Sequence, residues 1–158
     1  MRSKKTPAKK IQLDPIYSSP LVAKIINGCM QDGKKSVAAK QIYHAIDLVA
    51  EQSGKNGLEF LTEAIENVKP TIEVRSRRVG GASYQVPCPI RPERRDTLAI
   101  RWIINAAKAR SNNPTRTLAD KIAAEVMEAH DNQGAAIKKK LDTHKMAEAN
   151  KAFAHFRW

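Results

Sequence analysis

The sequence contains few of the residues that build metal sites, disulfide frameworks and membrane spans. Its 158 residues include two cysteines, Cys29 and Cys88, outside any CxxC motif, and four histidines with no pair at helical ligand spacing. These counts argue against a metal site, a cofactor of that kind or a disulfide scaffold, and indicate buried thiols in a reducing compartment. No apolar run approaches the roughly 20 residues that cross a bilayer, so we expect a soluble protein with no membrane partner.

Aromatic residues are also scarce, at 5% of a chain that is 42% hydrophobic. The core must therefore be built from leucine, isoleucine, valine and alanine, a composition that favours helices packed on helices. A chain of this length can withdraw about two thirds of its unfolded surface from water as one domain. We expect a mainly α single domain over residues 13–158, preceded by a separate N-terminal arm.

Acidic residues are outnumbered 16 to 28 by lysine and arginine, which gives a net charge of +12. The charge is segregated: residues 1–40 carry +7, residues 69–101 carry +5 and residues 133–158 carry +4, whereas residues 41–68 carry −4. Segregation of this kind predicts a binding face with a more neutral back. Residues 1–12 form a basic arm, expected to be disordered and to attract phosphates through its lysines. These are Lys4, Lys5, Lys9 and Lys10.

Apolar residues recur at helical spacing in six segments, with one hairpin between the third and fourth. Ser19-Pro20 starts the first helix, over about residues 20–31, and Ser36 can cap the second. The third ends before Pro70, a fifth begins at the cap and proline of residues 113 and 114, and the last begins near Asn132. In the fourth helix three bases at intervals of seven share one face. They are Arg94, Arg101 and Lys108.

The segment GCMQDGKKS, residues 28–36, nearly matches the phosphate-binding motif GxxxxGK[ST]. Lys35 occupies the position that needs a hydroxyl for magnesium, and the preceding residues form a helix rather than a strand. We therefore interpret Lys34 and Lys35 as phosphate contacts in a turn between helices, and reject nucleotide hydrolysis. The four histidines have no adjacent nucleophile in a recognisable motif, so no catalytic site is predicted.

Residues 71–91 read as a β-hairpin, because two runs rich in β-branched residues flank Gly80-Gly81. Arginines crowd the first run and the exit from the hairpin, and neighbouring guanidiniums repel one another unless an anion spreads their charge. A phosphate backbone is the expected partner, and arginine suits a bidentate grip on it. The arginines are Arg75, Arg77, Arg78, Arg94 and Arg95.

Two registers are possible for this hairpin. A two-residue Gly80-Gly81 turn pairs Val74 with Pro87 and scatters apolar side chains over both faces. A three-residue loop pairs Val74 with Cys88 instead and collects the apolar side chains on one face, so we prefer it. It also predicts Arg75 and Arg77 on the opposite face, and Arg78 beside Tyr84 near the tip, where a base could stack.

Three of the eight aromatic residues lie in the last six positions, at Phe153, Phe156 and Trp158. Basic residues alternate with them, a pattern that suits burial on the domain's own core as well as contact with RNA or protein. Both interpretations stay open from the sequence alone.

Several long segments together resemble small-subunit ribosomal protein seven of the bacterial type. They are LDPIYSSPLVAKIIN, MQDGKKSVA, ENVKPTIEVRSRRVGGASYQVP, RPERRDTLAIRWI and HKMAEANKAFAHFRW. The resemblance implies a helical domain with a protruding β-ribbon that binds the three-prime major domain of small-subunit ribosomal RNA and helps nucleate assembly of the subunit head. It also implies no enzymatic activity and a place in the cytoplasmic or organellar ribosome.

The resemblance further implies residue roles and partners. The matching motifs assign ribosomal RNA contacts to Lys34, Lys35, Arg75, Arg77, Arg78, Arg94 and Arg95. The ribbon tip at Gly80, Gly81 and Tyr84 would face the exit-site transfer RNA and messenger RNA. Neighbours would be small-subunit proteins nine, eleven, thirteen and nineteen.

Two other functions compete with this one. A β-ribbon with basic arms can enter the grooves of duplex DNA, so an architectural DNA-binding module is the alternative. A peripheral membrane protein needs an interfacial helix that is apolar and basic, whereas the apolar stripes here lie where a core needs them.

Overall fold

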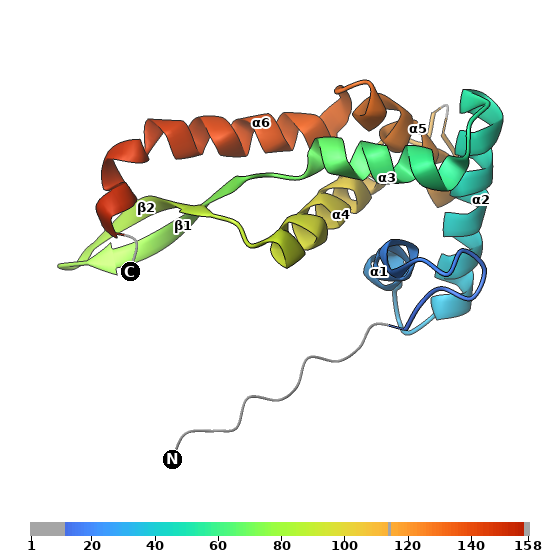
Figure 1. Ribbon diagram of the computed structural model, residues 1–158, viewed down its shortest axis with the longest axis horizontal. Coiled ribbons are helices and arrows are strands. Elements are labelled where there is room, and N and C mark those ends of the chain that lie inside the picture. The colour runs from blue at the N-terminus through green and yellow to red at the C-terminus, as the bar shows by residue number, and fades with distance from the viewer. Residues whose placement is uncertain (1–11, 114, 157–158) are drawn as a thin grey trace, which may run out of the picture.

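The computed structural model describes residues 12–113 and 115–156, and within them it is mainly helical with one two-stranded sheet (Figure 1). The sheet is a hairpin between the third and fourth helices, so the predicted fold class is confirmed. The described elements are α1 (Pro20–Cys29), α2 (Lys35–Ser53), α3 (Gly57–Val68), β1 (Ile72–Val79), β2 (Ala82–Pro89), α4 (Pro92–Ala109), α5 (Leu118–His130), α6 (Gly134–Ala149) and the 3-10 helix η1 (Lys151–Phe156).

The helix starts follow local capping chemistry. The Ser19 hydroxyl accepts a hydrogen bond from the backbone N–H of Leu21 at 3.3 Å, with Pro20 in the first helical position, as predicted for α1. The predicted start of α5 after residue 113 is wrong. Thr117 and Asp120 cap each other's backbone N–H groups at 3.2 and 2.9 Å, so the helix begins at Leu118. A reciprocal capping box satisfies two backbone N–H donors that would otherwise be unpaired. It therefore determines where the helix begins, in place of the proline.

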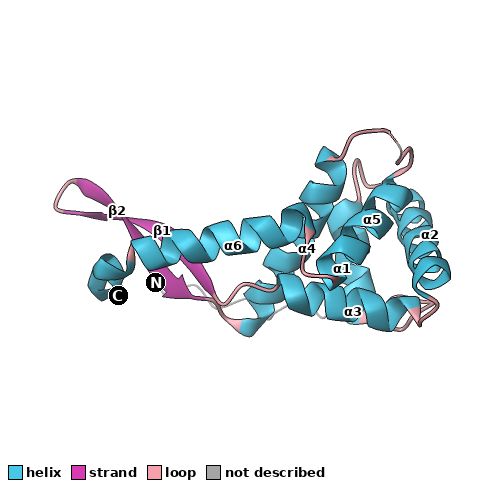
Figure 2. Cartoon of the chain, turned by 90° about the horizontal axis from the view of Figure 1, so that it is seen from above, coloured by secondary structure: helices cyan, strands magenta, loops and turns pink. Residues whose placement is uncertain are grey.

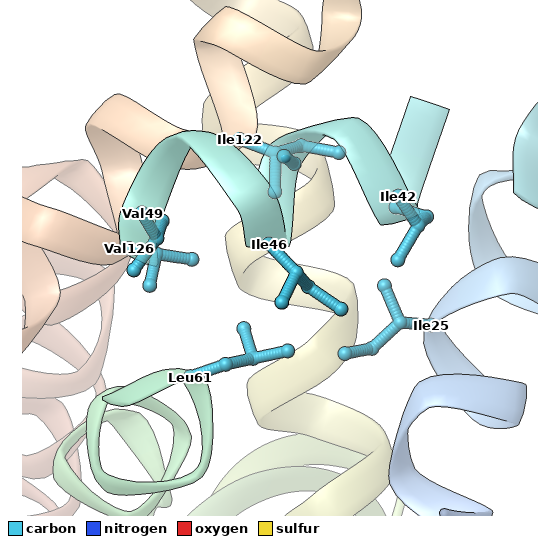
Figure 3. Close-up of a pocket in the computed structure, with 8 residues that line it drawn as sticks. Ile25, Ile42, Ile46, Val49, Leu61, Ile122 and Val126 are labelled. Carbon is cyan, nitrogen blue, oxygen red and sulfur yellow. The ribbon is translucent and has the colours of Figure 1, made fainter. Parts of the chain in front are cut away.

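The core is mainly aliphatic and is built from all six helices, α1 to α6. Ile46 of α2 points between Ile25 of α1 and Leu61 of α3, with Ile122 of α5 beside it (Figure 3). The voids found among these side chains are small, about 10 Å³ each. The helices thus bury the stripes that their sequence spacing predicts, and they form a rigid support for the surfaces around them.

A buried carboxylate on α5 joins the end of α4 to the start of α6. Glu125 of α5 is 0% exposed, and its carboxylate accepts from the Arg110 guanidinium at 2.8 Å and from the backbone N–H of Ala136 at 2.8 Å. Arg110 follows α4 and also pairs with Glu128, while Ala136 lies in the first turn of α6. This cluster holds the end of α4 and the start of α6 against α5. It was not predicted from the sequence.

The hairpin register differs from the preferred prediction. Val74 pairs with Pro87, because the strands are joined by a two-residue turn in which Gly80 and Gly81 have φ of 57° and 92°. Two successive positive φ values define the tight turn whose twist matches that of paired strands, and this turn overrides the sorting of apolar side chains. Arg77 therefore opposes Tyr84, and the paired side chains share a face. The other pairs are Ile72–Pro89, Glu73–Cys88, Arg75–Val86, Ser76–Gln85, Arg78–Ser83 and Val79–Ala82.

The hairpin extends from the helices together with α6. Both views show the hairpin and the C-terminal end of α6 reaching in the same direction, with the hairpin tip furthest out (Figures 1 and 2). At the base, the backbone N–H of Thr71 donates to Nε2 of His144 on α6 at 3.2 Å. Burial, followed by the charge of Lys140, lowers the pKa of His144, which favours the neutral ring that can accept this bond. The base of the ribbon is thus held by a helix.

The C-terminal aromatics pack on the hairpin rather than on the helical core. The rings of Phe153 and Phe156 in η1 each lie 5.2 Å from the ring of Tyr84 in β2, measured between centroids. Tyr84 is half-buried in this cluster, and it lies opposite Arg77, not beside Arg78 as the predicted register requires. Trp158 lies outside the described residues.

Candidate nucleic-acid interface

Two of the predicted hairpin arginines share one carboxylate. Glu73 of β1 is only 8% exposed, and its carboxylate accepts from Nε of Arg94 on α4 at 2.8 Å and also pairs with Arg75. Burial alone would raise the pKa of Glu73, but the hydrogen bonds from Arg94 and Arg75 outweigh it and hold the pKa below its usual value. The cluster keeps a net positive charge at neutral pH and fixes the base of the ribbon to α4.

The other arginines of the hairpin region keep their charge uncompensated. Among the described residues, Arg77 and Arg78 form no ion pair with a carboxylate, and they lie on opposite faces of the ribbon. Arg95 donates from Nε to the backbone carbonyl of Ile90 at 3.0 Å, which leaves its charge unneutralised and its position fixed. The base of the ribbon is fixed by contacts within the protein, whereas the tip keeps its uncompensated positive charge.

Residues of α1 and α4 line a cleft of about 340 Å³, which brings predicted and unpredicted cations together. Arg101 and Lys108 line it from α4 and form no ion pair within the described residues, whereas Lys24 lines it from α1 and lies 3.4 Å from Asp96. Arg94 continues the same stripe, so the bases on α4 extend over about 21 Å. The stripe on α4 is the one that the spacing of seven predicts, whereas Lys24 and the cleft were not predicted.

A second hollow of about 350 Å³ adjoins the first, since Lys108 lines both. Lys34 lines it from the turn before α2. The expected cap at Ser36 is wrong: Lys34 is the N-cap residue and Lys35 begins the helix. Cations at the positive end of a helix cost about 0.3 to 1 kcal/mol, and a bound anion would offset this cost.

Acidic residues gather on a different element. Glu59, Glu63 and Glu66 follow one another at helical spacing on α3 and are all exposed. The acidic cluster on α3 therefore lies on a different element from the basic cleft and hairpin, as the acidic and basic segments are separate in the sequence. The basic residues lie at the α1–α4 cleft, at the start of α2, on the hairpin and on α6.

The remaining predicted site residues have three outcomes. Gly80 and Gly81 are exposed at the tip of the ribbon. Tyr84 is nearby but its ring packs against Phe153 and Phe156. The four arm lysines, Lys4, Lys5, Lys9 and Lys10, lie outside the described residues.

Replacing Phe153 with alanine should loosen the ribbon. The substitution removes a ring contact with Tyr84, and an aromatic pair stabilises by about 0.5 to 1.5 kcal/mol beyond the area that it buries. We expect amide hydrogens of β1 and β2 near Tyr84 to exchange up to about tenfold faster, measured by mass spectrometry or NMR. Leu141→Ala, at an exposed site on α6, is the control. Equal exchange rates in Phe153→Ala and wild type would show that η1 does not hold the ribbon.

Comparison with known families bears on what this positive surface binds. The family model for "Ribosomal protein S7p/S5e" matches residues 1–151, nearly the whole chain. The chain belongs to this family. Curated relatives named "Small ribosomal subunit protein uS7" include those of Carboxydothermus hydrogenoformans, 57% identical over 96% of both chains, and Helicobacter hepaticus, 52% identical over 100% of both. The relative in Shewanella amazonensis is 55% identical over 95% of this chain and 94% of its own.

These relatives confirm the resemblance to the bacterial type of the S7p/S5e family. The family is one of ribosomal proteins, so the chain is a ribosomal protein of the small subunit. Within the described residues, no helix combines the length and apolar character needed to span a membrane.

Proposed function

We propose that the chain is a structural constituent of the small ribosomal subunit that binds ribosomal RNA through two surfaces, the α1–α4 cleft and the hairpin. The observation that carries this proposal is the row of uncompensated cations at the cleft. Arg101 and Lys108 lie on a concave surface with no carboxylate partner in the described chain. A concave surface of one charge sign concentrates counter-ions, and an RNA backbone supplies a row of them.

The two surfaces act as a clamp because α4 connects them. Arg94 at the start of α4 is tied to the ribbon through Glu73, while Lys108 near its end lines the cleft. An RNA segment that contacts both surfaces is held against a rigid helix, and its junction is fixed in the folded shape. Six or more phosphate contacts give a log-log salt slope steeper than about −4.

The finer features of the proposal follow the resemblance. The RNA is the three-prime major domain of small-subunit ribosomal RNA, and binding nucleates assembly of the head. The tip at Gly80 and Gly81, with Tyr84 behind it, faces exit-site transfer RNA and messenger RNA. The protein contacts small-subunit proteins nine, eleven, thirteen and nineteen in the cytoplasmic ribosome, has no catalytic role, and adds arm contacts through residues 1–12 to the domain at 13–158.

Competition between RNA and DNA separates this proposal from an architectural DNA-binding module. We expect the full chain to bind the transcribed three-prime major domain at least about 100-fold more tightly than a duplex DNA of equal length at 0.15 M salt. Filter binding with labelled RNA and unlabelled DNA measures the ratio. Equal affinity for both polymers would favour the DNA-binding function instead.

A further inference from the structure

Two asparagine side chains in the cleft have no partner in the described chain. Asn27 on α1 and Asn105 on α4 both line the cleft and are exposed, and neither amide hydrogen-bonds to another described residue. Other asparagine amides are used within the protein. Nδ2 of Asn67 donates to the carbonyl of His130 at 3.0 Å, and Nδ2 of Asn150 donates to the carbonyl of Met146 at 2.8 Å.

The two amides are interleaved with the cations. Asn27 lies one helical turn after Lys24, and Asn105 lies between Arg101 and Lys108 on the same face of α4. Lysine and arginine hold phosphates but carry no information about the bases attached to them. An amide differs from them because it offers both a donor and an acceptor.

Part of the cleft lining is apolar, and the hydroxyl of Thr97, which also lines it, already donates to the carbonyl of Glu93 at 3.0 Å. Ile100 and Ile104 of α4 and the bare Cα of Gly28 on α1 line the apolar part. A Cβ at Gly28 would lie 2.8 Å from Cδ1 of Ile104, so the absence of a side chain lets the two helices approach closely. The volume of about 340 Å³ is within the range of small-molecule pockets. An apolar floor with amides at its rim suits the flat face and polar edge of a nucleobase.

We propose that Asn27 and Asn105 read an unpaired adenine of the bound RNA, while Lys24, Arg101 and Lys108 hold the phosphates on either side of it. This inference rests on the proposed function. Sequence-specific proteins recognise RNA mainly at unstacked bases, because the grooves of an A-form helix offer side chains little to read. The asparagine amide matches adenine, whose N6 donates and whose N7 accepts.

The test compares specificity with general affinity. We expect the double variant Asn27→Ala/Asn105→Ala to lose about tenfold or more in the ratio of affinities for the three-prime major domain and for an unrelated structured RNA. Its salt slope should stay that of wild type, since no charge is removed. The midpoint temperature of thermal unfolding should be unchanged or slightly higher, because alanine is the better helix former at both exposed positions. Gln52→Ala, which removes an exposed amide on α2 outside the cleft, is the matched control.

Interference mapping identifies the base. In RNA transcribed with 7-deaza-adenosine, which lacks N7, wild-type protein should select against the analogue at one unpaired position, and the double variant should not. The inference is overturned if the double variant keeps the wild-type ratio or the same interference pattern. That failure is distinct from failure of the proposed function, in which wild-type protein itself would show no preference for the ribosomal RNA.

Discussion

Replacing Lys34, Arg101 and Lys108 together with glutamine should weaken binding to the three-prime major domain about 100-fold at 0.15 M salt. These three side chains line the α1–α4 cleft and the hollow beside it, and Lys108 lines both. Each lost phosphate contact reduces the magnitude of the log-log salt slope by about one, so the slope should become shallower by about three. Glutamine keeps much of the side-chain length, so the exposed surface should fold normally. Titrations at several salt concentrations measure both quantities.

A charge-matched control separates position from net charge. Lys138, Lys139 and Lys145 are exposed on α6, outside the cleft, and their replacement with glutamine removes the same total charge. If charge acts only through the cleft, this control should lose only a few-fold in affinity and keep most of the salt slope. Equal losses in the two triple variants would mean that RNA responds to the overall charge, and the cleft would have no special role.

Replacing Arg110 with alanine should cost about 3 to 5 kcal/mol of the free energy of unfolding and lower Tm by about 10 °C. Glu125 is fully buried, and without Arg110 its carboxylate keeps only the backbone N–H of Ala136 as a described partner. A buried charge left without its counter-charge is strongly destabilising. Chemical denaturation followed by circular dichroism measures the change.

Glu128→Gln is the control for this prediction. Glu128 contacts the same arginine, but its side chain is 43% exposed, so the pair should contribute less than about 1 kcal/mol. If Arg110→Ala has the same free energy of unfolding as the wild-type protein, the cluster does not hold α4, α5 and α6 together. Because α4 carries the cleft, a destabilised Arg110→Ala protein should also bind RNA more weakly.

The helices were predictable because their stripes are strong and their ends are capped locally. Ile42, Ile46 and Val49 recur at helical spacing and are buried together in α2. The start of α5 was missed because a capping box at Thr117 competes with the earlier proline and determines where the helix begins. The register was missed for a related reason, since the backbone twist of the Gly80-Gly81 turn outweighed side-chain sorting.

The candidate site was only partly visible in the sequence. Arg101 and Lys108 were found because a helix places residues seven apart on one face. Lys24 and Asn27 were not found, because they are more than 70 residues from Arg101 in the sequence. The packing of α1 on α4 brings them to the same cleft. The pairing of Glu73 with Arg94 was missed likewise, since only the register and the entry into α4 determine it.

Crosslinking of the intact protein to RNA in living cells, followed by sequencing of the RNA and of the crosslinked peptides, tests the central claim most directly. The account predicts that RNA contacts converge on one region of the three-prime major domain, and that the peptides come from α1, α4 and the hairpin. Contacts scattered over unrelated RNAs, or peptides drawn mainly from the acidic face of α3, would contradict it.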